Sequence, residues 1–457
     1  MTIHRPPTAV CASLLLVALS FACSPADNAS SPSSDAPWAE FPCDPDNGGI
    51  DLPEGFCGTV FADELGVARH LAVKANGDVY VARAPIRRRG EDGDIVVDSP
   101  GGVVALRDTD GDGKADLVEE LDPIAGTGLA IHDGHLYYST ATEIYRVELS
   151  DDLLPAAAPE LLVSGFPSQS QHASKPMTFD GAGNMYVTVG GPSNACQQDM
   201  RTPGSPGRDP CPQLQWHGGI WRFDASRPGQ THQGDGHRYA TGIRNGLALD
   251  WNPQVDALFA IQHGRDSLSQ LFPDQYSNQV SAELPAEEVF RVGEGDDFGW
   301  PYCYYDPAQQ KKVLAPEYGG DGETVGRCAE VAPTLFAFPA HWAPNDLLFY
   351  RDGTFGAHYE NGAFIAFHGS WNRGPFEQQG YKVVFLPFAD GIPSGSAENF
   401  AVGFPQVQEV RTPGDAVYRP TGLAQGPDGS LYIADSRRGR IWRVRVEAQS
   451  TADEPPR

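Results

Sequence analysis

The stretch Leu423-Ala-Gln-Gly-Pro-Asp-Gly-Ser-Leu-Tyr-Ile-Ala434 contains the pattern that decides the fold. A small or apolar pair is followed by a turn centred on Asp-Gly and then by a strand of alternating apolar residues. This order is typical of a β-hairpin. Four further copies and one weaker relative, the last in this list, occur along the chain, at residues 71–82, 129–139, 177–188, 247–260 and 359–367.

Six hairpins spaced tens of residues apart predict an all-β fold, a six-bladed β-propeller with long inter-strand loops over residues 38–446. An unrelated β-sandwich with similar hairpins is the alternative. The 51 glycines and 39 prolines favour a chain with many turns, and 457 residues are enough for one propeller. We expect the loops that follow the innermost strands to converge at the mouth of the central channel and to carry the function.

The chain is strongly acidic, with 60 acidic and 33 basic side chains and a formal net charge of −27. A field of this sign repels phosphate backbones, so we do not expect nucleic acid as a partner. If the protein binds an anion, it must gather basic side chains locally.

The N-terminus predicts export. Residues 1–22 are typical of a signal peptide, because Arg5 precedes a short apolar stretch from Ala12 to Ala22. No later stretch is apolar over the roughly 20 residues that a membrane span needs. We therefore expect an exported protein whose only membrane contact is an anchor.

Cys23 is the predicted site of that anchor. It follows Leu-Ser-Phe-Ala, which resembles a bacterial lipobox, and it precedes a Ser/Pro/Ala/Asp-rich tether over residues 23–37. Ordinary signal cleavage before Cys23 is the alternative. A lipid at Cys23 predicts a periplasmic or cell-surface lipoprotein of the outer membrane, and residues 447–457 are predicted to be a disordered tail.

The cysteine count fits this interpretation. Removal of the signal leaves seven cysteines, so one of them needs a role other than an internal disulfide. The other six can form fifteen sets of pairs. Because short loops close at the smallest entropic cost, the predicted disulfides are Cys43–Cys57, Cys196–Cys211 and Cys303–Cys328.

Residues 108–119 match the twelve-residue calcium loop of EF-hands. Gly113 allows the sharp turn, and the carboxylates would repel one another without a cation. The flanks are typical of strands, so we interpret the segment as a structural calcium clip in an inter-strand loop. A solvated acidic turn is the alternative. The predicted ligands are Asp108, Asp110, Asp112, Lys114 through its carbonyl, Asp116 and Glu119.

Five further segments carry a resemblance to a known family. They are Gln171-His-Ala-Ser-Lys-Pro, Gly242-Ile-Arg-Asn-Gly-Leu-Ala, Gln262-His-Gly-Arg-Asp, Ala366-Phe-His-Gly-Ser-Trp-Asn-Arg and Arg419-Pro-Thr-Gly-Leu-Ala. In this order and at blade-like spacing, they resemble the glucose and sorbosone dehydrogenase family of soluble quinoprotein propellers, from about residue 56 to residue 446. The Gln262-His-Gly-Arg segment, where glucose dehydrogenases have Glu-His-Gly-Pro, is nearer to the sorbosone-type branch.

The resemblance implies hydride transfer from an aldose, sorbosone-like or other sugar-type substrate to pyrroloquinoline quinone (PQQ), with an external electron acceptor and calcium. His172 matches the general base, a role that imidazole suits. PQQ carries three carboxylates, which arginine forks bind well. The implied cofactor ligands are Arg244, Asn245, Arg419, Lys175 and Arg373, and the implied calcium ligands are the carbonyls of Gly264 and Arg265.

Two other classes of function stay open from the sequence. One is a non-catalytic, surface-anchored propeller that binds glycan or protein, and the other is a calcium-dependent, lactonase-like hydrolase. At the level of single residues, His172 could be a structural histidine, and Arg244 with Asn245 could bond the neighbouring blade. His263 and His368 could equally touch substrate or orient a loop.

Overall fold

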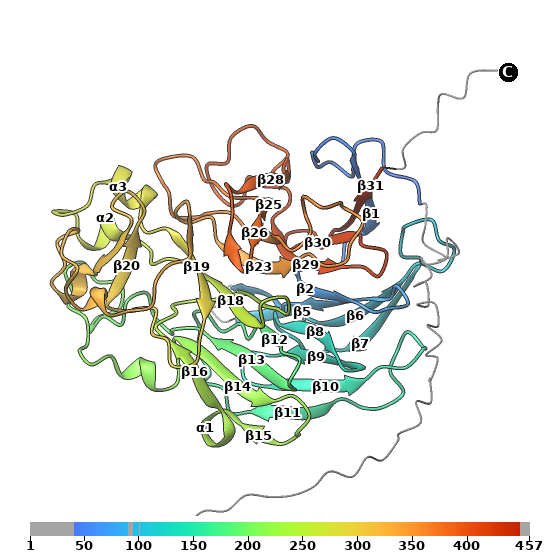
Figure 1. Ribbon diagram of the computed structural model, residues 1–457, viewed down its shortest axis with the longest axis horizontal. Coiled ribbons are helices and arrows are strands. Elements are labelled where there is room, and N and C mark those ends of the chain that lie inside the picture. The colour runs from blue at the N-terminus through green and yellow to red at the C-terminus, as the bar shows by residue number, and fades with distance from the viewer. Residues whose placement is uncertain (1–40, 90–94, 100, 448–457) are drawn as a thin grey trace, which may run out of the picture.

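The computed structural model describes residues 41–89, 95–99 and 101–447. These residues form six sheets arranged as the blades of a propeller, each with four antiparallel main strands (Figure 1). The first three blades follow one another along the chain. Blade 1 holds β2 (Ala68–Val73), β3 (Val79–Arg83), β6 (Gly102–Arg107) and β7 (Leu117–Asp122); blade 2 holds β8 (Leu129–His132), β9 (His135–Ser139), β10 (Ile144–Glu148) and β11 (Glu160–Ser164); blade 3 holds β12 (Met177–Phe179), β13 (Asn184–Val189), β14 (Gly219–Asp224) and β16 (His237–Thr241).

The last three blades complete the ring, and blade 6 takes its outer strand from the N-terminal end of the described chain. Blade 4 holds β17 (Ala248–Asn252), β18 (Ala257–Gln262), β19 (Glu287–Val292) and β22 (Phe336–Phe338); blade 5 holds β23 (Pro344–Phe349), β24 (Ala363–Phe367), β25 (Lys382–Leu386) and β28 (Glu398–Ala401); blade 6 holds β29 (Pro420–Gln425), β30 (Leu431–Asp435), β31 (Ile441–Val446) and β1 (Phe56–Ala62).

The ring is closed in two ways. The innermost strands β2, β8, β12, β17, β23 and β29 contact one another in that order and β29 returns to β2. At the outer edge of blade 6, β1 pairs antiparallel with β31, with Phe56 opposite Val446. A strand from each end of the described chain therefore holds the last blade together.

Smaller elements decorate the blades. The largest group lies beside blade 4, where α2, α3 and β20 gather at one side of the ring (Figure 1). The strands and helices outside the six main ladders are β4 (Ile86–Arg89), β5 (Ile95–Ser99), β15 (Gln230–Thr231), β20 (Cys303–Asp306), β21 (Lys311–Leu314), β26 (Phe388–Ala389), β27 (Ile392–Pro393), α1 (His232–Asp235), α2 (Leu268–Leu271), α3 (Asn278–Glu283) and the 3-10 turns Pro212–Gln215, Pro316–Tyr318 and Gly326–Ala329. None of the described helices is long and apolar enough to cross a membrane.

The core consists of apolar side chains packed between neighbouring blades. Between blades 5 and 6, Phe364 and Phe385 lie with Trp442 in one buried cluster. Each large apolar side chain buried in this way contributes about 1.5–3 kcal/mol. Because both faces of a blade are covered, middle strands such as β30 are buried at every position, and this explains their continuous apolar sequence.

Most sequence predictions of the fold are confirmed. The propeller has six blades, and the five clear hairpin segments supply the first two strands of blades 1, 2, 3, 4 and 6. The three disulfides are the predicted pairs, Cys43–Cys57, Cys196–Cys211 and Cys303–Cys328. The signal peptide, the tether with Cys23 and, apart from Glu447, the predicted tail lie outside the described residues.

The weak hairpin at residues 359–367 differs from the prediction. Only its second half is a strand, β24, and the partner of β24 is β23, which ends at Phe349. The intervening residues form a loop whose ends meet, because Tyr350 N donates to Gly362 O (2.9 Å) and Asn361 N donates to Tyr350 O (3.0 Å). The Asn-Gly turn therefore closes an insertion and does not join two strands directly.

Candidate functional site

A pocket of about 290 Å³ opens among the loops of blades 3, 4 and 5. The residues that line it lie in the loops that come before the innermost strand, or after the second strand, of each of these blades. This is the opposite face from the Asp-Gly turns, so the predicted position after the innermost strands is wrong. The lining residues are Gln171, His172, Arg201, Arg244, Asn245, His263, Gly264, Asp266, Glu287, His341, Ala343, Trp371 and Asn372.

His172 lies in this pocket in one defined tautomer. Its Nδ1 lies 2.5 Å from the carbonyl oxygen of Gly191, so Nδ1 carries the proton and donates it to that carbonyl. Nε2 is then the unprotonated nitrogen, and it has no hydrogen-bond partner among the described residues. Burial, followed by the nearby charge of Arg244, lowers the pKa of His172 to about 3, so the imidazole is neutral at pH 7.

The backbone at His172 has an unusual conformation. His172 has a φ of 51°, in the left-handed region that few bulky residues adopt. Gly190 leaves the room that this requires, because a Cβ there would lie 2.5 Å from the Cβ of His172. His172 in the pocket and Gly190 directly after β13 thus fit each other.

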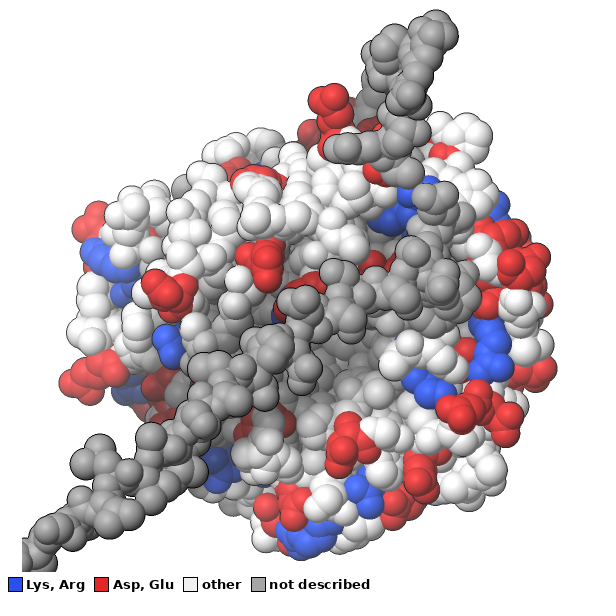
Figure 2. All heavy atoms as spheres, turned by 45° about the vertical axis from the view of Figure 1, so that its right-hand side comes forward, with Lys and Arg blue, Asp and Glu red and all other residues white. Residues whose placement is uncertain are grey.

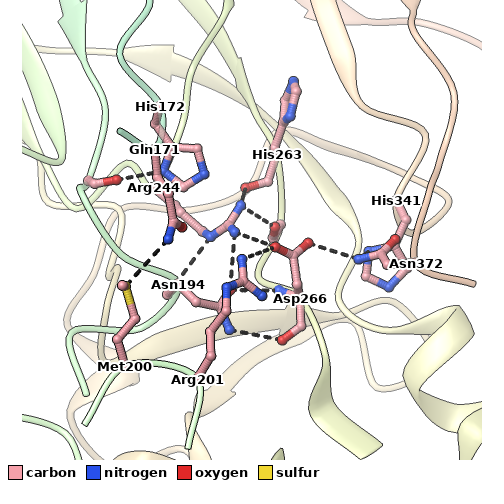
Figure 3. A network of polar contacts seen from close by, with 12 residues as sticks. Gln171, His172, Asn194, Met200, Arg201, Arg244, His263, Asp266, His341 and Asn372 are labelled. Carbon is pink, nitrogen blue, oxygen red and sulfur yellow. Dashed lines mark hydrogen bonds and ion pairs between the residues drawn. The ribbon is translucent and has the colours of Figure 1, made fainter. Parts of the chain in front are cut away.

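Arg244 is fully engaged by neighbouring loops (Figure 3). Its Nε donates to Asn194 O (3.2 Å), its Nη1 to Gly264 O (2.8 Å), and its Nη2 to Asn194 Oδ1 (3.1 Å). Nη2 also donates to Asp266 Oδ2 (2.7 Å). The guanidinium is almost completely buried, so these contacts fix the wall of the pocket between blades 3 and 4. Its neighbour Asn245, which is also buried, lines the pocket as predicted.

Asp266 is the centre of this network. Its Oδ2 accepts from Arg244 and from Arg201 Nη2 (3.0 Å), and its Oδ1 accepts from Asn372 Nδ2 (2.8 Å). Asn372 also contacts His341 Nδ1 (3.2 Å). One carboxylate therefore joins loops of three blades, and the pKa of Asp266 lies well below its usual range because these cations outweigh the effect of burial.

Glu287 closes the pocket from the start of β19. Its Oε2 accepts from Gly264 N (2.7 Å) and its Oε1 from Ala343 N (3.2 Å). Burial raises the pKa of Glu287 to about 8. Gly264 is thus held from both sides, because its carbonyl oxygen also accepts from Arg244. A calcium ion bound to the Gly264 carbonyl oxygen would therefore share that oxygen with the guanidinium of Arg244.

A second basic group lies deeper, toward the propeller axis. Arg419 stacks on Tyr381 and donates to His368 O (2.9 Å) and Gly369 O (2.8 Å). Burial lowers the pKa of Arg419 to about 10, with Arg69 among the neighbouring charges. Arg69 has no hydrogen-bond or ion-pair partner among the described residues, and its Nε is buried.

His263 joins the two groups. Its ring points away from the Asp266 network in Figure 3, and its Nε2 donates to Pro344 O (2.8 Å). Burial lowers its pKa to about 4, and both Arg244 and Arg69 lie close enough to contribute. Neither guanidinium forms an ion pair among the described residues, although the buried carboxylate of Asp435 lies near Arg419. Two such groups near the axis can bind an anionic ligand. Arg69 was not identified from the sequence.

Three residues of the predicted site point elsewhere. Lys175 is completely buried, donates to Ala173 O (2.7 Å) and lies over Phe166, outside the pocket lining. Arg373 donates to Glu283 (3.0 Å) and to the carbonyl of Ala282 at the end of α3.

The Arg265 side chain is buried against Glu317, so only its backbone could face a ligand. Arg373 and Arg265, like Lys175, are absent from the pocket lining.

The predicted calcium loop lies far from this pocket in the chain, between β6 and β7, as its flanks indicated. Carboxylate oxygens of Asp108, Asp110 and Asp116 lie within 4.8 Å of one another. Asp112 and Glu119 are not part of this group. Asp112 instead accepts from the backbone N–H of Lys114 (2.8 Å), and Glu119 lies in β7 opposite Ala105.

Charged side chains on one face of the molecule are more often acidic than basic (Figure 2). In the face that Figure 2 shows, acidic side chains are spread widely and basic ones lie among them without a large patch. An acidic protein that binds an anion needs basic side chains close together. In this protein they lie in the interior, where Arg69, Arg244 and Arg419 are gathered.

Comparisons with known proteins agree with this architecture. The chain is 26% identical over 236 residues to a Coprinopsis cinerea protein named pyrroloquinoline quinone-dependent pyranose dehydrogenase, an alignment that covers 45% of this chain and 30% of that protein. It is 27% identical over 210 residues to an uncharacterized protein of Borreliella burgdorferi, covering 46% and 48%. The chain thus spans about half or less of the curated relatives that it matches.

Solved structures show the same fold. Family AA12 of carbohydrate-active enzymes from Trichoderma reesei aligns with a TM-score of 0.68 and 19% identity, over 87% of this chain and 98% of that one. The PQQ domain of Coprinopsis cinerea pyranose dehydrogenase, in its holo form, gives 0.67 and 18%, over 87% and 97%. The aldose sugar dehydrogenase of Escherichia coli gives 0.52 and 15%, over 86% and 100%.

These comparisons confirm the resemblance to the quinoprotein propellers at the level of the family. A family model described as TrAA12-like matches residues 50–447, which is most of the chain. The chain belongs to the TrAA12-like family.

Proposed function

We propose that the protein is an exported, PQQ-dependent dehydrogenase that oxidises an aldose, sorbosone-like or other sugar-type substrate. Family membership, the name of its Coprinopsis relative and the pocket chemistry support this proposal. The observation that carries it is the hydrogen bond from Nδ1 of His172 to Gly191 O, which leaves Nε2 without a partner among the described residues of the pocket.

The residues present fit the cofactor. Arg69 and Arg419 would hold carboxylates of PQQ, because their guanidinium groups lie near each other and neither forms an ion pair among the described residues. The buried Asn245 would bind a carbonyl oxygen of the cofactor, as the resemblance implies, and Arg244 would hold the loops that surround it. When bound, PQQ supplies the group that accepts a hydride from the substrate carbon.

His172 would act as the general base. Oxidation of a hemiacetal carbon removes a hydride from that carbon and a proton from its hydroxyl, and the carbon becomes a lactone carbonyl. Nε2 of His172 would take the proton, while the Nδ1–H bond to Gly191 O keeps the ring in place and stabilises the imidazolium that forms. An anion bound nearby would raise the low pKa of His172 toward the working pH.

Calcium, the anchor and the acceptor complete the proposal. Backbone carbonyls of Gly264 and Arg265 would offer the hard oxygen ligands that calcium prefers, and the acidic group of Asp108, Asp110 and Asp116 would hold a second, structural ion. The sequence around Cys23 supports a lipid anchor at the outer membrane. Electrons would leave to an external acceptor.

The test uses the purified protein with calcium and PQQ. We expect saturable uptake of PQQ and reduction of an artificial dye with members of a panel of aldoses and keto-aldoses. His172→Ala should reduce turnover by about 100-fold to 10,000-fold and leave PQQ uptake intact, as for loss of a general base.

Three results would reject the proposal. Full activity of His172→Ala would show that His172 is not the general base. Failure of the protein to take up PQQ would favour a propeller that binds glycan or protein without catalysis. Hydrolysis of a sugar lactone with calcium alone would favour the lactonase-like activity.

A further inference from the structure

Arg201 is a partly exposed cation at the mouth of the pocket, and it was not identified from the sequence. It lines the pocket together with His172, and its side chain is 33% exposed. Only Nη2 has a hydrogen-bond partner among the described residues, Asp266 Oδ2 at 3.0 Å. The remaining N–H groups of the guanidinium are available to a ligand.

The loop that carries Arg201 is built to present it. The loop is closed by the disulfide Cys196–Cys211, and Arg201 has a φ of 54° in the left-handed region. A buried side chain, Gln197, accepts the backbone N–H of Arg201 (2.9 Å) and holds this conformation. Bulky residues in this region cost about 1–3 kcal/mol and gather at functional sites. His172, His341 and Ala343 share the conformation, and all of them line the same pocket.

The charge around Arg201 is incompletely neutralised. Asp266 contacts both Arg201 and Arg244, so one carboxylate serves two guanidinium groups. Arg244 is buried and directs its N–H groups to protein acceptors, whereas Arg201 reaches the pocket mouth. Arg201 is therefore the cation of this network that can meet an anion from solvent.

An apolar surface lies at the same mouth. Trp371, which also lines the pocket, is 56% exposed, and Met200 next to Arg201 is 54% exposed. An exposed indole is a surface on which the apolar face of a sugar ring can rest. A cation and an indole that line the same pocket offer a combined site for a ring and for a negative group attached to it.

From this geometry we infer that Arg201 binds the carboxylate of an acidic sugar and thereby sets the substrate class of the enzyme. The ring would lie against Trp371, and the hydroxyl that reacts would face His172. This inference rests on the proposed dehydrogenase function and narrows its substrate to sugars that carry a carboxylate, such as uronates.

The experiment compares two substrates that differ only at one carbon. Protein loaded with PQQ and calcium is assayed by dye reduction with D-glucuronate and with D-glucose, and kcat/KM is measured for each. We expect the wild type to favour glucuronate, and Arg201→Gln to lower the ratio of the two kcat/KM values by about 10-fold or more, the effect of losing one charge-assisted contact. The loss should appear mainly in KM for glucuronate.

Three further measurements separate binding from structure. Arg201→Lys should keep part of the preference, because it retains the charge without the planar fork. Arg208→Gln changes an exposed arginine of the same disulfide-closed loop and should keep the wild-type ratio. The wild-type ratio should fall as ionic strength rises, since an exposed ion pair is screened by salt.

Several outcomes would overturn the inference. Turnover of glucose without preference for glucuronate would reject it and leave the proposed function standing. An equal ratio in wild type and Arg201→Gln would also reject it. Weaker uptake of PQQ by Arg201→Gln would assign Arg201 to the cofactor instead. Turnover of neither sugar nor any other aldose would remove both proposals.

Discussion

The pocket around Asp266 and the acidic loop of residues 108–119 differ in how they are assembled. The pocket takes its charged groups from loops of three blades, more than a hundred residues apart, and buries most of them. The acidic loop uses one run of the chain, and the hydrogen bonds that its carboxylates accept are local, as between Asp108 and the backbone of Gly111 (2.7 Å). Its charged side chains also form ion pairs with distant residues, Lys114–Asp44 (3.1 Å) and Arg443–Asp108 (3.8 Å). A site that is continuous in sequence can be recognised from its spacing, whereas an assembled site depends on the fold.

The difference also predicts different energetics. Charged side chains in the pocket are removed from water. If one of them is substituted, its partner stays buried without a counter-charge, and the cost of desolvating that partner is no longer compensated. Charges in the acidic loop remain largely exposed and are screened by water. Substitutions in the pocket should therefore have the larger effects, and the following predictions test that ranking.

Asp266→Asn should have the largest effect on stability. It leaves Arg244 and Arg201 without their shared counter-charge, and loss of one partner of a buried ion pair costs about 3–5 kcal/mol. Asp209→Asn is the matched control, because Asp209 and Arg327 pair with both side chains about half exposed (48% and 46%). It should cost about 0–1 kcal/mol. Denaturant unfolding measures both, and equal losses would contradict the ranking.

Arg419→Gln and Lys175→Met should separate a cofactor ligand from a structural lysine. Arg419→Gln removes one charge-assisted contact, so the affinity for PQQ should fall by about 10-fold to 100-fold. Lys175 lies outside the pocket and has the carbonyl of Ala173 as its hydrogen-bond acceptor. Lys175→Met should leave PQQ affinity unchanged, as measured by titration of the apo protein. A comparable loss in both variants would restore Lys175 as a cofactor ligand.

Calcium should stabilise the protein through the acidic loop by a smaller amount. Saturating calcium should raise the Tm by about 2–4 °C relative to chelator, since ligand binding to the folded state adds to stability. Asp116→Asn removes one of the three gathered carboxylates and should abolish most of that rise. Glu119→Gln is the informative control, because Glu119 lies outside the group. If Glu119→Gln also abolishes the rise, the loop closes around the ion as an EF-hand loop does.

Much of the fold could be predicted because its signals are local. Asp/Asn-Gly turns and alternating strands mark four blades directly, and the turn of blade 4 contains Asn252-Pro253 instead. Short cysteine spacings indicated the disulfide pairs. The insertion at residues 350–362 hid the sixth hairpin, because its partner strand lies upstream of the recognised turn. No local pattern predicts that the N-terminal strand β1 completes blade 6, since this pairing joins the two ends of the described chain.

The site was harder to predict than the fold. His172, Arg244, Asn245 and Gly264 line the pocket as expected, but Lys175, which follows His172 by three residues, points into the core. Two residues in one irregular loop need not face the same side, so spacing alone could not separate them.

The missed residues show the same limit. Asp266 is the last residue of the recognised Gln262-His-Gly-Arg-Asp segment, but the sequence assigned no role to it. Arg201 had no signal beyond its place between two cysteines that form a disulfide.

The pH dependence of stability reports directly on the buried interior. Burial lowers the pKa of His172 to about 3 and that of His232 to about 4, below the ordinary value of about 6.5. Because the folded state disfavours protonation, the stability linked to each neutral histidine is complete above pH 6.5 and is lost as the pH falls toward these values. His172→Gln and His232→Phe should each make the decrease in unfolding free energy between pH 6.5 and 4 less steep. An unchanged slope in both variants would mean that these imidazoles gain protons in the folded protein as readily as in the unfolded chain, and the neutral base in the pocket would lose its physical basis.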